Sequence, residues 1–216
     1  MPANHVSILD YGMANLRSVQ KAFEHVGVEA RLIRTSDEVR SAGRLVLPGV
    51  GAVGDALAHL REQGLDDAIR SHVASGRPFL GICLGLQMLF ERCFEDGEHV
   101  GLGIVKGDCV RFEVDEKHSL KVPLKVPLKV PHMGWNSLRV AGESPLFAGM
   151  SDGAYAYFVH SYFVRPTDSG VVTTFTDYGG DFASSIRHGN VVATQFHPEK
   201  SQAVGLKMLE NFARMN

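Results

Sequence analysis

The stretch PFLGICLGLQMLF, residues 78–90, places a cysteine between two glycines, directly after one apolar run and directly before another. The first run, 78–82, has the length and composition of a buried strand. Gly81, Cys83 and Gly85 fit the pattern G-x-nucleophile-x-G, in which a tight turn from strand to helix exposes the middle side chain. A helix is predicted after the turn, because apolar residues recur there at helical spacing: Leu86, Leu89, Phe90, Cys93 and Phe94. The stretch therefore predicts an α/β fold with Cys83 at the carboxyl end of a strand.

The same alternation extends toward the amino terminus. Short apolar or alternating runs predict strands at 6–10, 29–34 and 44–47. A helix is predicted over 55–75, and another is indicated by a face made of Leu16, Val19, Phe23 and Val26. Right-handed crossovers between such strands give a parallel sheet that is covered on both faces.

From about residue 100 the pattern changes to short strand candidates that are separated by turn residues. They lie at 103–113, 135–140, 155–164, 171–177, 182–187 and 191–196. This spacing indicates antiparallel strands. A final helix is predicted over 201–216. No linker interrupts the sequence, so we expect a single domain, 1–216.

Composition excludes several classes of protein. The 216 residues carry a net charge of only −2, which gives no general attraction to nucleic acid or to an anionic membrane. The amino terminus lacks the features of a signal peptide, and no apolar run approaches the roughly 18 residues of a membrane span. Three cysteines, spaced by 10 and 16 residues, fit neither a disulfide framework nor a zinc site. We expect a soluble, cytoplasmic protein with reduced thiols and no metal.

The segment LKVPLKVPLKVP, 120–131, repeats a unit of four residues three times. Proline in every unit excludes both a helix interior and a central strand. An extended, exposed loop is expected, and a small basic docking strip made of its lysines is the alternative.

The position of Cys83 indicates a nucleophile. The helix predicted after it would place partial positive charge and free amides beside the sulfur, and both favour the reactive thiolate. The alternative is a buried cysteine that acts as a small hydrophobic residue. That is our interpretation of Cys93 and Cys109, which lack the flanking glycines.

A base for this nucleophile is predicted in the stretch VVATQFHPEK, 191–200. His197 follows an apolar strand, and Pro198 biases it toward extended geometry. Glu199 then lies on the same side of the chain and can orient the imidazole, as in cysteine-dependent acyl transfer. A surface turn is the alternative.

The loop Gly49-Val50-Gly51-Ala52-Val53-Gly54 matches the dinucleotide-binding pattern G-x-G-x-x-G. It follows a later strand than expected for that pattern, and the acids about 15 residues on lie in a helix-like segment. We favour a second use, in which backbone amides of the loop face an oxyanion beside the thiol.

Six stretches together resemble the class I glutamine amidotransferases, and within that family the glutaminase subunits of imidazole glycerol phosphate synthases: GICLGLQMLF, HPEKS, LPGVGAVGD, DYGMANLRS, PHMGWN and FVHSYF. They span nearly the whole chain. The resemblance implies a flavodoxin-like three-layer α/β fold, with a mostly parallel central sheet and antiparallel strands in the C-terminal half. It also implies hydrolysis of glutamine to glutamate and ammonia, without a cofactor.

The resemblance assigns roles to residues of this sequence. Cys83 would be the nucleophile, His197 the base and then the acid, and Glu199 the group that orients it. Backbone amides of Val50 or Gly51 and of Leu84 would form the oxyanion hole. Gln87, Ser161 and Tyr162 would hold the substrate.

By the same resemblance, ammonia passes to a partner cyclase subunit, a (β/α)8 barrel that joins it to a phosphorylated ribulosyl aminoimidazole intermediate. The two subunits would form a heterodimer. Family members are nearly idle until the cyclase binds its ligand, which reorganises the oxyanion loop, and we expect the same here. The residues expected at the interface are Asn15, Arg17, Trp135, Tyr157 and Lys200.

The sequence departs from the family pattern at two places. Ala14 replaces a glycine, and the LKVP unit occurs three times instead of once. Another amidotransferase, a plain hydrolase, a non-catalytic scaffold and a nucleotide-binding oxidoreductase stay open as alternatives, although PHMGWN argues against other amidotransferases.

Overall fold

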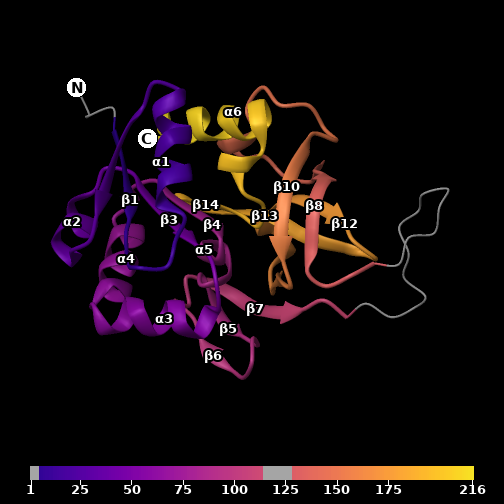
Figure 1. Ribbon diagram of the computed structural model, residues 1–216, viewed down its shortest axis with the longest axis horizontal. Coiled ribbons are helices and arrows are strands. Elements are labelled where there is room, and N and C mark those ends of the chain that lie inside the picture. Colours follow the sequence, from indigo (N-terminus) through magenta and orange to yellow (C-terminus); the bar gives the residue numbers. More distant parts are fainter. Residues whose placement is uncertain (1–4, 114–127) are drawn as a thin grey trace.

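A large sheet runs through the centre of the protein, with helices on both of its faces (Figure 1). The structure is a computed structural model that describes residues 5–113 and 128–216. Along the sheet the strand order is β2-β1-β3-β4-β14-β13-β11-β7-β5-β6, and β12 pairs with both β13 and β9. Strands β8 and β10 form a separate antiparallel pair.

The first half of the sheet is parallel, as predicted. Every residue of β3 and β4 is buried, because these strands are covered on both faces. β14, from the far end of the chain, pairs with β4 in parallel register and extends this half. The parallel strands are β1 (His5–Leu9), β2 (Glu29–Ile33), β3 (Leu45–Gly49), β4 (Phe79–Cys83) and β14 (Val191–Thr194).

Two apolar cores fill the space between the sheet and its helices. Helices α2 (Ser36–Ser41), α3 (Val53–Glu62) and α4 (Leu65–Ala74) cover one face, and α1 (Leu16–His25) and α6 (Gln202–Ala213) cover the other. Figure 1 shows α1 and α6 together on one side of the sheet. Within residues 5–113 and 128–216, none of the helices is both long and apolar enough to cross a membrane.

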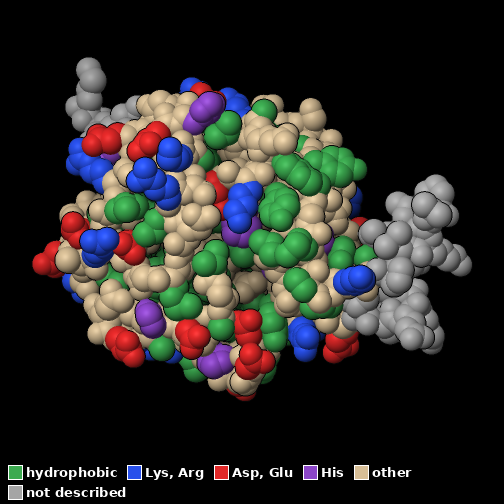
Figure 2. Space-filling model, viewed as in Figure 1, with side chains coloured by type: hydrophobic (Ala, Val, Ile, Leu, Met, Phe, Trp, Pro, Cys, Tyr) green, Lys and Arg blue, Asp and Glu red, His purple; other side chains and the backbone are tan. Residues whose placement is uncertain are grey.

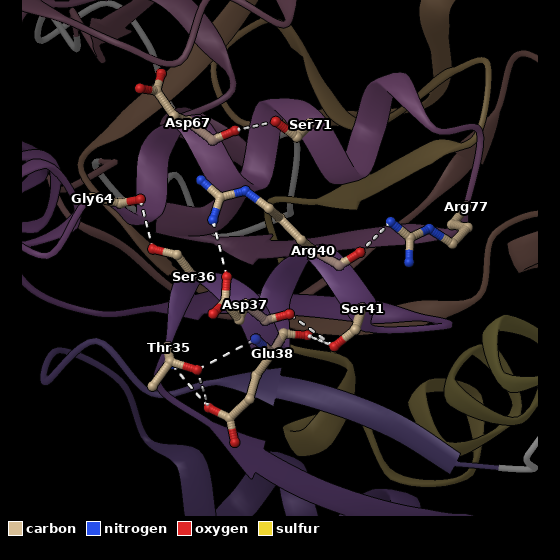
Figure 3. A network of polar contacts seen from close by, with 10 residues as sticks. All are labelled: Thr35, Ser36, Asp37, Glu38, Arg40, Ser41, Gly64, Asp67, Ser71 and Arg77. Atoms are coloured by element: carbon tan, nitrogen blue, oxygen red, sulfur yellow. Dashed lines mark hydrogen bonds and ion pairs between the residues drawn. The ribbon is translucent and has the colours of Figure 1, made fainter.

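The helix predicted over 55–75 is in fact two helices. Gly64 has a φ of +62°, in the left-handed region, and breaks the helix between α3 and α4. Helix α2 was not predicted from the sequence. Its amino terminus is a capping box, in which the Thr35 hydroxyl accepts the Glu38 N–H at 3.3 Å and the Glu38 carboxylate accepts the Thr35 N–H at 2.9 Å (Figure 3).

The prediction of a long helix after Cys83 is wrong. Helix α5 (Leu84–Gln87) makes a single turn, and the chain then becomes strand β5 (Phe90–Cys93), which pairs in parallel with β7 (Val105–Arg111). Every residue from 84 to 90 is buried, so apolar spacing alone did not separate a helix from a strand. Tertiary pairing with β7 decided the outcome.

Most pairings among the C-terminal strands are antiparallel, as predicted. The prediction is wrong for one edge of two strands: β14, from the candidate 191–196, pairs in parallel with β4, and β7, from the candidate 103–113, pairs in parallel with β5. The candidate 155–164 is two strands instead of one. The strand is interrupted at Ser161, so that β10 pairs with β8 while β11 pairs with β7 and β13. The strands of this region are β8 (His132–Ser137), β9 (Arg139–Val140), β10 (Tyr155–His160), β11 (Tyr162–Pro166), β12 (Val172–Asp177) and β13 (Asp181–His188), and β6 (His99–Val100) closes the sheet edge beside β5. The flavodoxin-like order of the parallel strands together with these antiparallel strands confirms the predicted fold class.

Most of the LKVP repeat lies outside the described residues. Of its last unit, Leu128 is buried, and the Lys129 carbonyl accepts the Tyr178 hydroxyl at 2.7 Å. The expectation of an exposed loop is therefore wrong for Leu128. Ala14 does not take a positive φ, so the loss of glycine there costs no backbone strain.

Candidate active site

Cys83 is the last residue of β4 and the residue from which α5 begins. Its φ of +54° and ψ of −106° are rare for a residue with a side chain, which marks a strained turn of the kind that presents a nucleophile. The following glycine allows the turn to approach β3 closely. A Cβ on Gly85 would lie only 1.9 Å from the Leu47 carbonyl oxygen. The predicted elbow is present, although the helix after it is too short to supply the dipole that the sequence suggested.

His197 and Glu199 arrive beside Cys83 because β14 pairs with β4, with Thr194 opposite Ile82. His197 Nδ1 lies 2.7 Å from Glu199 Oε1, and the two side chains are 4% and 2% exposed. His197 is extended, as predicted, with a φ of −100° and a ψ of 98°. The extended chain does not continue to Glu199, however, because Pro198–Lys200 forms a 3-10 turn. Pro198 opens the turn, which brings the carboxylate back toward the ring.

His197 is strongly biased toward its protonated form. Burial by itself lowers the pKa of His197, but the charge and hydrogen bond of Cys83, followed by those of Glu199, outweigh burial and raise the pKa to about 10. Since Nδ1 faces the carboxylate, Nε2 is the nitrogen available to the sulfur. Below that pH an imidazolium faces the sulfur and stabilises its thiolate.

A cavity of about 310 Å³ opens onto this sulfur. Eight of the nine predicted catalytic, oxyanion and substrate residues line it; the ninth, Glu199, is not in the lining and pairs with His197. The predicted residues that line it are Val50, Gly51, Cys83, Leu84, Gln87, Ser161, Tyr162 and His197. A larger cavity, of about 430 Å³, lies beside Arg111 and Tyr178 and contains none of them.

The oxyanion donors are only partly in place. Of the two amides predicted for this loop, Val50 or Gly51, the Val50 N–H donates to the Met13 carbonyl at 3.2 Å and is not available to an oxyanion in this conformation. Gly51 has a φ of +94° and lines the cavity. Leu84 is the first residue of α5, where an amide has no acceptor within its own helix.

The loop's glycines make room for other parts of the chain and not for a dinucleotide. A Cβ on Gly49 would meet the Tyr11 hydroxyl at 2.7 Å, and one on Gly54 would meet the His99 ring at 2.6 Å. A phosphate would need that space. The part of the chain that the structure describes also contains no cluster of three or more His, Cys, Asp or Glu side chains that could hold a metal ion.

Sequence reasoning missed two polar side chains at the site. Glu95 lines the cavity, and its carboxylate accepts the Val53 N–H at 2.6 Å, which ties it to the oxyanion loop. Gln195 is fully buried, with its Nε2 3.7 Å from Cys83 Sγ. Gln195 precedes His197 by two residues, and that spacing was the available signal; Glu95 gave none, because β5 was predicted as helix.

The residues expected at a partner interface lie on the surface. Trp135 and Tyr157 are cross-strand neighbours on β8 and β10, with ring centroids 6.0 Å apart, and Lys200 Nζ lies 6.0 Å from the Tyr157 ring. Asn15 and Arg17 are exposed at the start of α1, which contacts the turn that holds Lys200. Figure 2 shows hydrophobic side chains gathered over the side of the molecule where β8 and β10 lie.

Comparisons with known proteins identify the family of the chain. The chain matches the family Glutamine amidotransferase class-I over residues 7–215. It is 52% identical to the imidazole glycerol phosphate synthase subunit HisH of Rhodopirellula baltica, with 96% of each chain covered. It is 54% identical to the subunit of that name from Aquifex aeolicus, with 96% of this chain and 95% of the relative covered.

Solved structures show the same fold at lower sequence identity. A crystal structure of a glutamine amidotransferase superposes with a TM-score of 0.69 at 22% identity, covering 96% of this chain and 98% of that one. The structure of PurLQS from Thermotoga maritima gives a TM-score of 0.72 at 18% identity, with 95% of each chain covered. The cysteine elbow, the buried histidine and carboxylate, and the family match together place the chain in the class I glutamine amidotransferases.

Proposed function

We propose that this protein is the glutaminase subunit of an imidazole glycerol phosphate synthase, which hydrolyses L-glutamine to glutamate and ammonia. The observation that carries the proposal is the position of Cys83 at the mouth of a cavity, beside a His197 that is paired with Glu199. The 52% and 54% identities to HisH subunits support the assignment to this synthase. The active unit is one domain, 1–216.

The reaction proceeds through a thioester on Cys83. The thiolate attacks the carboxamide carbon of glutamine, and the negative charge on oxygen is bound by backbone amides of the Gly51 loop and Leu84. His197 gives its Nε2 proton to the leaving nitrogen, so that the C–N bond breaks and ammonia departs. His197 then removes a proton from water, which attacks the thioester to release glutamate and the thiolate.

The cavity has the groups needed to hold glutamine. The Gln87 NH₂ donates to the Tyr162 carbonyl at 3.0 Å and to Gln195 Oε1 at 3.2 Å, so its oxygen is the atom left for the substrate. Ser161 and Tyr162 also line the cavity, at the junction between β10 and β11. The Glu95 carboxylate is suited to the substrate's α-ammonium group. No cofactor takes part.

Activity depends on the conformation of the oxyanion loop. With the Val50 N–H bonded to Met13, one donor of the oxyanion hole is missing. Loss of a single such donor costs about 10²- to 10³-fold in rate. We propose that the partner's liganded state releases this bond and lets the Val50 amide turn toward the oxyanion.

The proposed partner is a cyclase subunit with a (β/α)8 barrel, which forms a heterodimer with this chain in the cytoplasm and receives its ammonia. The exposed surface defined by Asn15, Arg17, Trp135, Tyr157 and Lys200 is the proposed interface. Trp135 is 45% exposed and Met133 is 63% exposed. Large apolar side chains with this much exposed surface are suited to burial against a second protein.

The test measures glutamate release by wild type, Cys83→Ala and Cys109→Ala, each with and without the cyclase and its ligand. Cys83→Ala should be inactive, and Cys109→Ala, which changes a buried thiol outside the cavity, should retain activity. Glutamate release by Cys83→Ala at the wild-type rate would reject the proposed nucleophile. Equal wild-type rates with and without the liganded cyclase would reject the proposed regulation.

A further inference from the structure

Gln195 connects the nucleophile to a buried chain of hydrogen bonds. Its Nε2 lies 3.7 Å from Cys83 Sγ, and its Oε1 accepts from Gln87 Nε2 at 3.2 Å. Gln87 Nε2 also donates to the Tyr162 carbonyl at 3.0 Å. Gln195 is fully buried, so these neighbours replace water as its partners.

In each of these hydrogen bonds, the residue that donates and the residue that accepts are fixed. A backbone carbonyl can only accept, so the NH₂ group of Gln87 must face Tyr162, and its second hydrogen then points to Gln195. A rotated Gln195 amide would set two NH₂ groups against each other. Gln195 must therefore present its own NH₂ group, a donor, to the sulfur of Cys83.

A second branch fixes the same Tyr162 carbonyl from the other side. His160 Nδ1 donates to it at 2.8 Å, and His132 Nδ1 donates in turn to His160 Nε2 at 3.0 Å. Asn136 Nδ2 lies 3.3 Å from His132 Nε2 and donates to the Asp177 carbonyl at 2.9 Å. The series of hydrogen bonds thus runs from Asn136 and His132 on β8 to the sulfur of Cys83.

Both imidazoles in this branch are neutral near pH 7. Burial lowers the pKa of His132 to about 4, and burial together with the neighbouring His132 lowers the pKa of His160 to about 3. A neutral imidazole has one N–H donor and one acceptor nitrogen. Each ring therefore donates one hydrogen bond and accepts one, which fixes the order of donors and acceptors along the branch. Protonation of either ring would set two donors face to face.

We propose that Gln195 is a positioning residue that donates an N–H hydrogen bond to the Cys83 thiolate, with its orientation imposed by Gln87 and the Tyr162 carbonyl. The neutral thiol has another partner, since Cys83 Sγ lies 3.9 Å from the Val159 carbonyl oxygen, which can only accept. The donor from Gln195 and the acceptor from Val159 therefore favour different states of the sulfur. Gln195 stabilises the state that attacks the substrate.

The inference rests on the proposed role of Cys83 as the nucleophile. Its test measures the rate at which iodoacetamide alkylates Cys83, followed by intact-protein mass spectrometry across pH 6–9. Alkylation requires no glutamine turnover, so its result is independent of the glutaminase test. The variants are Gln195→Glu, which replaces the donor with a carboxylate, and Gln195→Met, which removes it at similar volume. Thr194→Val, a buried neighbour whose hydroxyl bonds to the Phe196 carbonyl, is the matched control.

Both Gln195 variants should be alkylated about tenfold more slowly than wild type at pH 7, because a hydrogen bond to a charged group is worth roughly one power of ten or more. Their rates should approach the wild-type rate at higher pH, a change that a merely structural defect would not produce. Thr194→Val should follow the wild-type curve. If Gln195→Glu does not unfold cooperatively, and is therefore misfolded, the alkylation rate of Gln195→Met alone tests the inference. Alkylation of Gln195→Met within twofold of wild type throughout the pH range would overturn the inference.

Discussion

Replacement of Gly85 by alanine tests whether the elbow depends on close backbone packing. The added Cβ would lie 1.9 Å from the Leu47 carbonyl oxygen, whereas ordinary contact begins at 3.4 Å, so the two segments must separate by about 1.5 Å. The obstacle is the backbone of β3, which pairs with both β1 and β4 and has no side-chain freedom with which to move away.

Overpacking of a buried site costs about 1 to 3 kcal/mol, and a clash between two backbone segments belongs at the upper end. We expect Gly85→Ala to lower the free energy of unfolding by about 3 kcal/mol. For a chain of this length that loss corresponds to a fall of about 6 to 12 °C in the melting temperature. Glutamine hydrolysis should fall as well, because the displaced turn carries Cys83 with it.

The assay is urea and thermal unfolding of Gly85→Ala, with Gly43→Ala as the control. A Cβ on Gly43 meets nothing within 4 Å, and that exposed residue has no positive φ. Gly43→Ala should stay within about 0.5 kcal/mol of wild type. If Gly85→Ala unfolds with the wild-type free energy and hydrolyses glutamine at the wild-type rate, the packing argument for the elbow is refuted.

Three further predictions concern the site and its support. Glu199→Gln should lower the pKa of His197, so that the imidazolium is lost earlier and the alkaline limb of kcat/KM moves down by about 1 to 3 pH units; Glu210→Gln, which changes a half-buried carboxylate outside the cavity, should leave that limb in place. In the native protein at pH 8, mass-spectrometric labelling should modify Cys83, which lines the cavity, and spare Cys93 and Cys109, which are buried outside it. A hydrogen bond with Cys93, followed by burial, also raises the pKa of Cys109. Equal labelling of the three cysteines would contradict this. Thr35→Ala should lose about 1 kcal/mol of stability in urea unfolding, and Thr35→Ser, which keeps the capping oxygen, should lose little.

The parallel half of the fold and the proximity of Cys83, His197 and Glu199, the proposed catalytic residues, were predictable because their signals are local. Gly81 and Gly85 flank Cys83 within five residues, and His197 and Glu199 are separated only by a proline. Strands such as β3 and β4 are short, apolar and bounded by glycine or proline, so their burial on two faces can be recognised without knowledge of the partner strand.

The parts that failed depend on contacts between distant segments. Phe90 and Cys93 are equally apolar in a buried helix and in a buried strand, and only pairing with β7 selects the strand. The break at Ser161 arises because β10 and β11 pair with different strands. Gln195 and Glu95 join the site through neighbours that the chain brings from far away. The spacing of Gln195 from His197 was the one local signal, and Glu95 had none.

The pairing of β4 with β14 also has a consequence for biosynthesis. Cys83 leaves the ribosome long before His197 and Glu199, and domains assemble as translation proceeds from the amino terminus. A nascent or truncated polypeptide therefore carries an ordinary sulfhydryl, without an imidazolium to activate it. The thiol gains its histidine partner only when β14, the last strand of the polypeptide, pairs with β4 in the interior of the sheet, so an incomplete translation product lacks the activated nucleophile.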